Sequence, residues 1–91
     1  MPGQKRTAVR LVGKPDCGLC AQMREIVERV SPGYGLSLED VDVRDDPELE
    51  RRYVLEIPVL LLGEQEVVRH RVTEGDLRKR LEALGLAPHP P

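Results

Sequence analysis

Two cysteines, Cys17 and Cys20, are the residues whose types and spacing point most directly to chemistry in this chain. Cys20 falls one helical turn after Cys17 if the segment is helical, so the two sulfurs can meet within disulfide geometry. A disulfide across so short a segment restricts the unfolded chain very little, because the stabilisation grows with loop length. The pair therefore predicts thiol–disulfide exchange rather than a structural cross-link.

The flanking residues predict that the pair lies where a strand gives way to a helix. An apolar, β-branched run at 7–12 stops at a loop over 13–16, and apolar residues then recur at helical spacing. At a helix N-terminus, free N–H groups and the helix dipole favour a thiolate, the reactive form of cysteine. Lys14 adds a positive charge nearby. Cys17 is thus the expected nucleophile, and the more buried Cys20 is the expected resolving thiol.

Other interpretations of the cysteines stay open at this point. A zinc site needs four ligands, and the chain adds only His70 and His89, neither at a standard spacing. A dimer could share two cysteine pairs around a metal or an iron–sulfur cluster. Inert, buried cysteines are the third possibility. Asp16, next to Cys17, either caps the helix or opposes the thiolate with its negative charge.

The composition argues against several classes of binding partner and location. The 91 residues suit one domain, 1–91, and the net charge of -2 argues against nucleic acid. Arg69-His70-Arg71 is a local cationic cluster of the kind that normally marks a solvated face. No apolar run is long enough to cross a membrane, and none after the basic start resembles a secretory signal. We therefore expect a cytoplasmic monomer.

Hydrophobic patterning predicts seven elements in the order strand, helix, strand, helix, strand, strand, helix. Ser31–Gly35 is expected to end the first helix, and Asp46-Pro47 to start the second, with Glu48 and Arg52 paired on its outer face. Thr73 is expected to cap the last helix, which ends at Gly85 before a frayed tail. The expected strands are 7–12, 36–43, 59–62 and 66–72. Helices between the first three strands predict parallel pairing, and the last two strands predict a hairpin.

Three segments carry a resemblance to the thioredoxin and glutaredoxin superfamily, closest to its glutaredoxin-like branch. They are Asp16-Cys17-Gly18-Leu19-Cys20, residues 41–49, and Tyr53 through Ile57-Pro58-Val59-Leu60, and the likeness covers roughly residues 7–84. It implies an α/β thioredoxin-like fold of order βαβαββα, with a four-stranded mixed sheet and helices on both faces. The ends, about 1–6 and 86–91, are expected to be flexible.

The resemblance also implies a substrate site. Pro58 would be the family's cis-proline, leaving the Ile57 backbone free to pair with an extended substrate; an ordinary proline at a strand start is the alternative. Lys14 stands where glutaredoxins often place a cation. Asp76 and the N–H groups beside Thr73 would hold glutathione. The sequence departs from the family here, because no Gly-Gly pair precedes Asp76 and Leu19 replaces the usual residue between the cysteines.

The expected function is therefore a thiol–disulfide oxidoreductase of cell redox homeostasis that acts on a disulfide-bearing protein or on glutathione. Electrons would come from glutathione or from a thioredoxin reductase-type donor, and no cofactor or metal would be bound. The alternative is a non-catalytic binding module, or a metal or iron–sulfur carrier, on the same fold.

Overall fold

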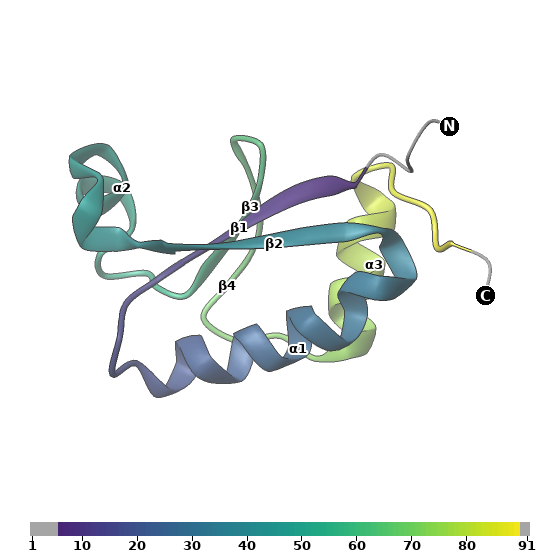
Figure 1. Cartoon of the computed structure of the whole chain (residues 1–91), viewed down its shortest axis with the longest axis horizontal. Helices are drawn as coiled ribbons and strands as arrows, with labels where there is room; N and C mark the ends of the chain where they lie inside the picture. The colour runs from purple at the N-terminus through teal and green to yellow at the C-terminus, as the bar shows by residue number, and fades with distance from the viewer. Residues whose placement is uncertain (1–5, 90–91) are drawn as a thin grey trace.

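A computed structural model of the chain describes residues 6–89, and its elements follow the predicted order. Figure 1 shows strands and helices alternating up to β3, where the chain turns into a hairpin. The elements are β1 (Thr7–Gly13), α1 (Gly18–Tyr34), β2 (Leu36–Asp42), a 3-10 turn η1 (Val43–Asp45), α2 (Pro47–Tyr53), β3 (Val59–Leu62), β4 (Gln65–Arg69) and α3 (Glu74–Ala83).

The four strands form one mixed sheet in the order β2-β1-β3-β4. β1 and β2 are parallel, whereas β3 is antiparallel to both β1 and β4. The prediction that the first three strands run parallel is therefore wrong for β3. α2 has seven residues and rises about 10 Å, whereas the seven-residue β2 spans about 23 Å. α2 lies beyond one end of the sheet (Figure 1), so the chain enters β3 from the end where β2 leaves it.

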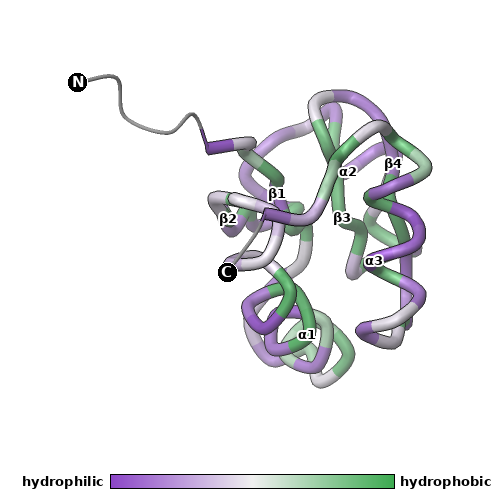
Figure 2. The backbone as a smooth tube through the Cα atoms, turned by 90° about the vertical axis from the view of Figure 1, so that its right-hand side faces the viewer, coloured by the Kyte–Doolittle hydropathy of each residue, from purple (hydrophilic) through white to green (hydrophobic). Residues whose placement is uncertain are grey.

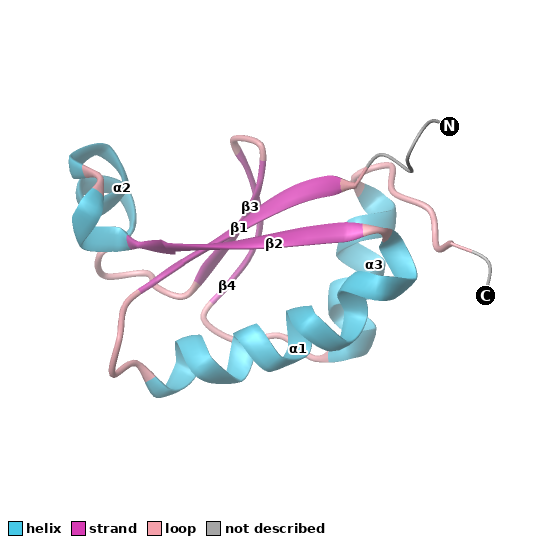
Figure 3. Ribbon diagram, in the orientation of Figure 1, coloured by secondary structure: helices cyan, strands magenta, loops and turns pink. Residues whose placement is uncertain are grey.

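Helices cover both faces of this sheet, as expected for a thioredoxin-like fold. α1 and α3 pack together on one face (Figure 3), and their apolar side chains meet Val9, Leu11 and Leu60 in the larger core. On the other face, α2 contributes Leu49 and Tyr53 to a smaller core. In Figure 2, β3 is mainly in the hydrophobic colour, whereas α1 alternates between hydrophobic and hydrophilic colours. Leu60 of β3 lies in the larger core, and Val59 and Leu61 lie in the smaller one, which confirms that the apolar run of β3 is covered on both faces.

Helix α1 ends within the predicted segment Ser31–Gly35, but at Gly35, because the helix continues through Pro32 instead of breaking there. Proline costs the helix one N–H hydrogen bond, and only two helical residues follow Pro32. The hydroxyl of Ser31 donates to the carbonyl of Val27 over 2.6 Å and supports the last turn. Gly35, with φ 64°, then ends the helix and donates its N–H to the Ser31 carbonyl.

Two smaller expectations also need correction. β4 ends at Arg69 rather than at residue 72, because His70 leaves the strand with φ 68°. On α2, Glu48 pairs with Arg51 over 2.6 Å instead of with Arg52. Arg52 lies over the ring of Tyr53, 5.3 Å from its centre. Three residues separate Glu48 from Arg51, a spacing that brings helical side chains together as well as four does.

The C-terminal segment is attached to the fold as far as it is described. The His89 N–H donates to the Gly33 carbonyl over 2.6 Å, and the His89 ring lies against Gly35. These contacts join residue 89 to the C-terminal end of α1. Residues 1–5 and 90–91, which share the expectation of flexible ends, lie outside the described residues. Between residues 6 and 89, no helix has the length and apolar character needed to cross a bilayer.

Candidate active site

Cys17 is the N-cap residue of α1. Its backbone is extended, with φ -113° and ψ 108°, and its sulfur accepts the N–H of Cys20 over 3.1 Å. A side-chain acceptor at this position satisfies one of the N–H groups that a helix start leaves free. Asp16 precedes the cap with φ 62° and is exposed, so the interpretation of Asp16 as the cap is wrong. The sulfur itself takes that place.

Cys20 lies one turn behind Cys17, and the two sulfurs are joined in a disulfide with the Cα atoms 5.2 Å apart. Only 8% of the Cys20 surface is exposed, whereas Cys17 is half-buried. The expected asymmetry between an accessible and a sheltered sulfur is therefore present. The side chains point toward one another, as the one-turn spacing requires.

The first turn of α1 contains no acidic residue. By contrast, α2 carries Glu48 and Glu50 in its first turn, and α3 carries Glu74 and Asp76. Carboxylates at a helix start are normally favourable, because they face the positive end of the dipole. At α1 this position holds the Cys17 sulfur instead, which leaves the positive end of the helix available to a thiolate.

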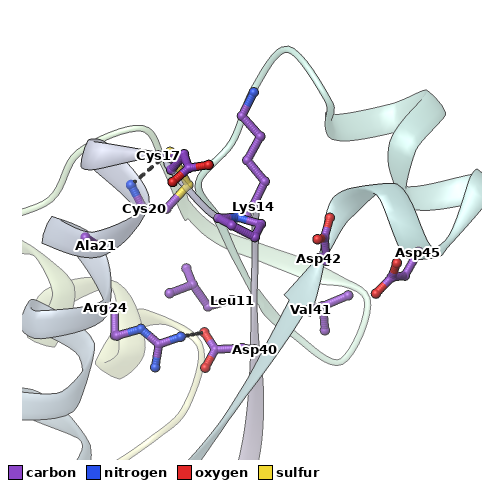
Figure 4. Close-up of a pocket in the computed structure, with 13 residues that line it drawn as sticks. Leu11, Lys14, Cys17, Cys20, Ala21, Arg24, Asp40, Val41, Asp42 and Asp45 are labelled. Atoms are coloured by element: carbon purple, nitrogen blue, oxygen red, sulfur yellow. Dashed lines mark hydrogen bonds and ion pairs between the residues drawn. A yellow bond between two sulfur atoms is a disulfide. The ribbon is translucent and has the colours of Figure 1, made fainter.

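One cleft, of about 510 Å³, lies beside the disulfide on the β2 side. Figure 4 shows the two cysteines at one end of it, Lys14 beside them, and Asp40, Asp42 and Asp45 along β2 and the turn after it. Arg24 and Asp40 form an ion pair across the cleft. The structure thus places Lys14 near the cysteines, together with a group of carboxylates.

Asp42, in the wall of this cleft, forms an ion pair with Arg44. The Arg44 guanidinium donates to both carboxylate oxygens of Asp42, over 3.0 and 2.7 Å, and its backbone N–H donates over 2.9 Å. These bonds lower the pKa of Asp42 to about 2, with Lys14 as a smaller contribution. The same bonds raise the pKa of Arg44. Asp42 therefore stays charged at neutral pH.

A second cleft, of about 530 Å³, lies on the opposite side of the first turns of α1. Leu19, Met23 and Ile26 of α1 line it together with residues 70–73 and Asp76. Two of the predicted substrate residues are therefore separated, because Lys14 lines one cleft and Asp76 lines the other.

The N-terminus of α3 borders this second cleft. Thr73 caps the helix as predicted, because its hydroxyl accepts the Asp76 N–H over 3.1 Å. The backbone N–H of Asp76 is thus already bonded within the chain. Its use for glutathione would require this bond to be exchanged.

Ile57 and Pro58 end the loop between α2 and β3, and the peptide bond between them is cis. Pro58 is fully buried, and its carbonyl accepts the His70 N–H over 2.8 Å. His70 in turn contacts Glu56 through its Nε2 atom over 3.1 Å. This loop and the residues after β4 are therefore tied together next to the second cleft.

The cationic cluster is exposed, as predicted for a solvated face. Arg69 donates to Glu66 and Glu56, and these hydrogen bonds, led by the one to Glu66, raise the pKa of Arg69. Across residues 6–89, no group of three or more His, Cys, Asp or Glu side chains is placed to hold a metal ion. His89 lies at the C-terminal end of α1, the opposite end from the cysteines.

Sequence reasoning missed two residues of the site. Gly13 contacts Cys20 closely enough that a Cβ atom there would lie 2.9 Å from the Cys20 sulfur. Asp42 faces the loop that carries Lys14. Neither contact follows from a pattern within one element, since the first joins the end of β1 to the start of α1 and the second joins β2 to the loop after β1. A glycine at the end of a strand was the one available signal.

Comparison with known proteins places this arrangement in a family. Residues 8–82 match the family model described as Glutaredoxin-like domain (DUF836). The solution structure of the structural-genomics target XcR50 from X. campestris is 32% identical, with a TM-score of 0.68, over 91% of this chain and 99% of that one.

Two more distant structures share the fold. Protein Ne2328 from Nitrosomonas europaea has a TM-score of 0.70 at 21% identity, over 87% of this chain and 96% of that one. Thioredoxin 1 from Thermosipho africanus has a TM-score of 0.60 at 16% identity, over 85% and 92% of the two chains.

Proposed function

This chain belongs to the glutaredoxin-like domain family, and we propose that it is a thiol–disulfide oxidoreductase in which Cys17 and Cys20 exchange electrons with a disulfide substrate. The observation that carries the proposal is the position of the Cys17 sulfur at the positive end of α1, with the sheltered Cys20 one turn behind it. The family match and the thioredoxin-like fold support a redox role for the pair.

The reaction follows from the asymmetry of the two sulfurs. The Cys17 thiolate attacks one sulfur of the substrate disulfide, which breaks the substrate S–S bond and releases the other sulfur as a thiolate. The Cys20 thiol then loses its proton and attacks the Cys17 sulfur, which releases the second substrate sulfur. The substrate gains two electrons and two protons, and the chain is left with the Cys17–Cys20 disulfide. A thiol donor returns it to the dithiol.

The loop at Ile57 and Pro58 and the cleft beyond Leu19 are the proposed substrate contacts. An extended substrate would pair with the backbone at Ile57, and its flanking side chain would enter the apolar cleft lined by Met23 and Ile26. Asp76, exposed at the rim of that cleft, would contact the substrate or glutathione. Lys14 lies on the other side, and its proposed role is electrostatic, through its positive charge near Cys17.

The test is a disulfide-reduction assay run separately with glutathione and with a thioredoxin reductase system. Cys17→Ser is expected to abolish turnover with either donor, and Cys20→Ser to accumulate a covalent mixed disulfide that mass spectrometry detects. The two variants control for each other, since each removes the intramolecular disulfide but only one removes the nucleophile. Wild-type turnover in Cys17→Ser would refute the mechanism.

The same preparations distinguish a carrier from an oxidoreductase. Wild-type protein that is isolated with a visible chromophore or with stoichiometric zinc, and that reduces no disulfide with either donor, would contradict the proposal. Activity with only one donor assigns the electron source. Asp76→Ala is expected to raise KM for glutathione if glutathione is that source, and to leave the thioredoxin reductase rate unchanged.

A further inference from the structure

Gly13, the last residue of β1, is buried against the resolving cysteine. A Cβ atom at Gly13 would lie 2.9 Å from the sulfur of Cys20 and 3.2 Å from its Cβ atom. Non-bonded carbon atoms pack at about 3.5–4.0 Å, and sulfur is larger than carbon, so any side chain here forces Cys20 to move. By contrast, a Cβ atom at Gly18, Gly33, Gly63, Gly75 or Gly85 would meet nothing within 4 Å.

The backbone does not explain this glycine. Gly13 lies outside the left-handed region that favours glycine, which holds Gly35, Gly63 and Gly85. It continues the regular parallel pairing of β1 with β2, opposite Asp42. An alanine would suit the strand at least as well, because glycine within a strand costs conformational entropy. What glycine provides here is space for the Cys20 sulfur.

We propose that Gly13 is a positioning residue that sets the redox equilibrium of the Cys17–Cys20 pair. Because β1 ends in glycine, the Cys20 sulfur can lie against the strand at the place from which it bonds Cys17. The inference rests on the proposed function in one respect, namely that the pair cycles between dithiol and disulfide.

The two redox states differ in how they respond to a side chain at Gly13. In the disulfide, the Cys20 sulfur is tethered to Cys17 and remains in the space that a methyl group would occupy. In the dithiol, rotation about the Cα–Cβ bond of Cys20 carries the sulfur away. The 3.2 Å contact with the Cys20 Cβ atom persists in both states, so it lowers stability without changing the equilibrium between them. A methyl group therefore penalises the disulfide selectively.

The same contact affects the resolving step. When Cys17 carries a substrate in a mixed disulfide, Cys20 must return its sulfur to the position beside β1 in order to attack. A methyl group at Gly13 obstructs that return but leaves the first attack by Cys17 unhindered. Gly13→Ala is thus expected to accumulate the mixed disulfide, as Cys20→Ser does, but to a smaller extent.

The experiment is a redox titration of wild type, Gly13→Ala and Gly33→Ala in dithiothreitol buffers. Dithiothreitol donates two electrons and two protons to the Cys17–Cys20 disulfide and becomes a cyclic disulfide, and thiol alkylation followed by mass spectrometry reports the reduced fraction. Gly13→Ala is expected to shift the equilibrium toward the dithiol by tenfold or more, which makes the potential about 30 mV less negative. Gly33→Ala adds the same methyl group in open space at the far end of α1, and is expected to leave the dithiol–disulfide equilibrium unchanged.

A less than twofold shift in Gly13→Ala would overturn the inference. This measurement requires neither a substrate nor a physiological donor. A shifted equilibrium in a protein without reductase activity would therefore refute the proposed function alone, and an active protein with an unshifted equilibrium would refute only the role of Gly13.

A double-mutant cycle covers the case in which Gly13→Ala folds poorly. In a Cys20→Ala background the sulfur is gone, so the loss of stability caused by Gly13→Ala is expected to be smaller than in oxidised wild type, where the sulfur is tethered beside β1, as measured by urea unfolding. An equal loss in both backgrounds would show that Gly13 does not act through Cys20.

Discussion

Exchanging Cys17 for serine or for alanine separates its role as a nucleophile from its role as a helix cap. Both variants lose the thiol, and neither can form the disulfide with Cys20. Serine keeps an oxygen that can accept the Cys20 N–H, which the Cys17 sulfur now accepts over 3.1 Å. Alanine leaves that N–H without a side-chain acceptor. The two variants are therefore expected to be equally inactive but unequally stable.

The size of the difference follows from the cap. Replacing a good N-cap residue by alanine costs 0.5–2 kcal/mol, typically about 1 kcal/mol. The entropy of unfolding is about 2.1 cal/mol/K per residue, or about 190 cal/mol/K for 91 residues. A difference of about 1 kcal/mol thus lowers Tm by about 5 °C. We expect Cys17→Ala to melt about 5 °C below Cys17→Ser.

The assay is thermal unfolding followed by circular dichroism, with excess dithiothreitol so that Cys20 stays reduced. The chain provides a matched control at the start of α3, where the Thr73 hydroxyl accepts the Asp76 N–H over 3.1 Å. Thr73→Ser and Thr73→Ala should differ by a similar amount. If the Thr73 pair separates and the Cys17 pair melts at one temperature, the sulfur of Cys17 is not a cap, and the argument for a thiolate at the positive end of α1 fails.

Three further predictions concern stability. Because Arg44 lowers the pKa of Asp42, their pairing stabilises the fold above pH 3.8, and this stabilisation is lost as the pH falls toward about 2. Asp42→Asn should therefore flatten the dependence of Tm on pH across that interval. The hydrogen bond to Glu82 raises the pKa of Tyr34 above 10.0, so stability should fall as the pH rises beyond that value, and less in Tyr34→Phe by urea unfolding. Leu77 of α3 is fully buried in the larger core, so Leu77→Ala should lower the free energy of unfolding by about 2–5 kcal/mol, measured by the same method.

Local sequence patterns predicted the kind and order of the elements because each element has its own periodicity or capping signal. Asp46 before Pro47 is an example, since the Asp46 carboxylate accepts the N–H groups of Glu48 and Leu49 at the start of α2. The direction of β3 was not available in this way. It depends on whether α2 is long enough to bring the chain back along the sheet, a comparison of two lengths rather than a local pattern.

In the candidate site, too, local patterns predicted some features, and others depend on how the elements pack. The spacing of Cys17 and Cys20 predicted their meeting, because it depends on a single helical turn. The contact of Gly13 with Cys20 joins the end of a strand to the first turn of a helix, and the separation of Lys14 from Asp76 depends on how two loops surround α1. Such contacts arise only when the elements pack, so no pattern within one element could reveal them.

The start of α1 gives up a source of stability that the other helices use. α2 and α3 begin with acidic residues, whose interaction with the helix dipole typically contributes 0.3–1 kcal/mol, whereas α1 begins with none. A carboxylate in that turn would stabilise the resting protein and would repel a thiolate at Cys17. If the proposed exchange reaction is correct, the absence of acidic side chains from this first turn keeps all carboxylates except that of Asp16, just before the helix, away from the start of α1. Gly13 is a second such position under the role proposed for it, because glycine is unfavourable within a strand and lies against the same pair of sulfurs.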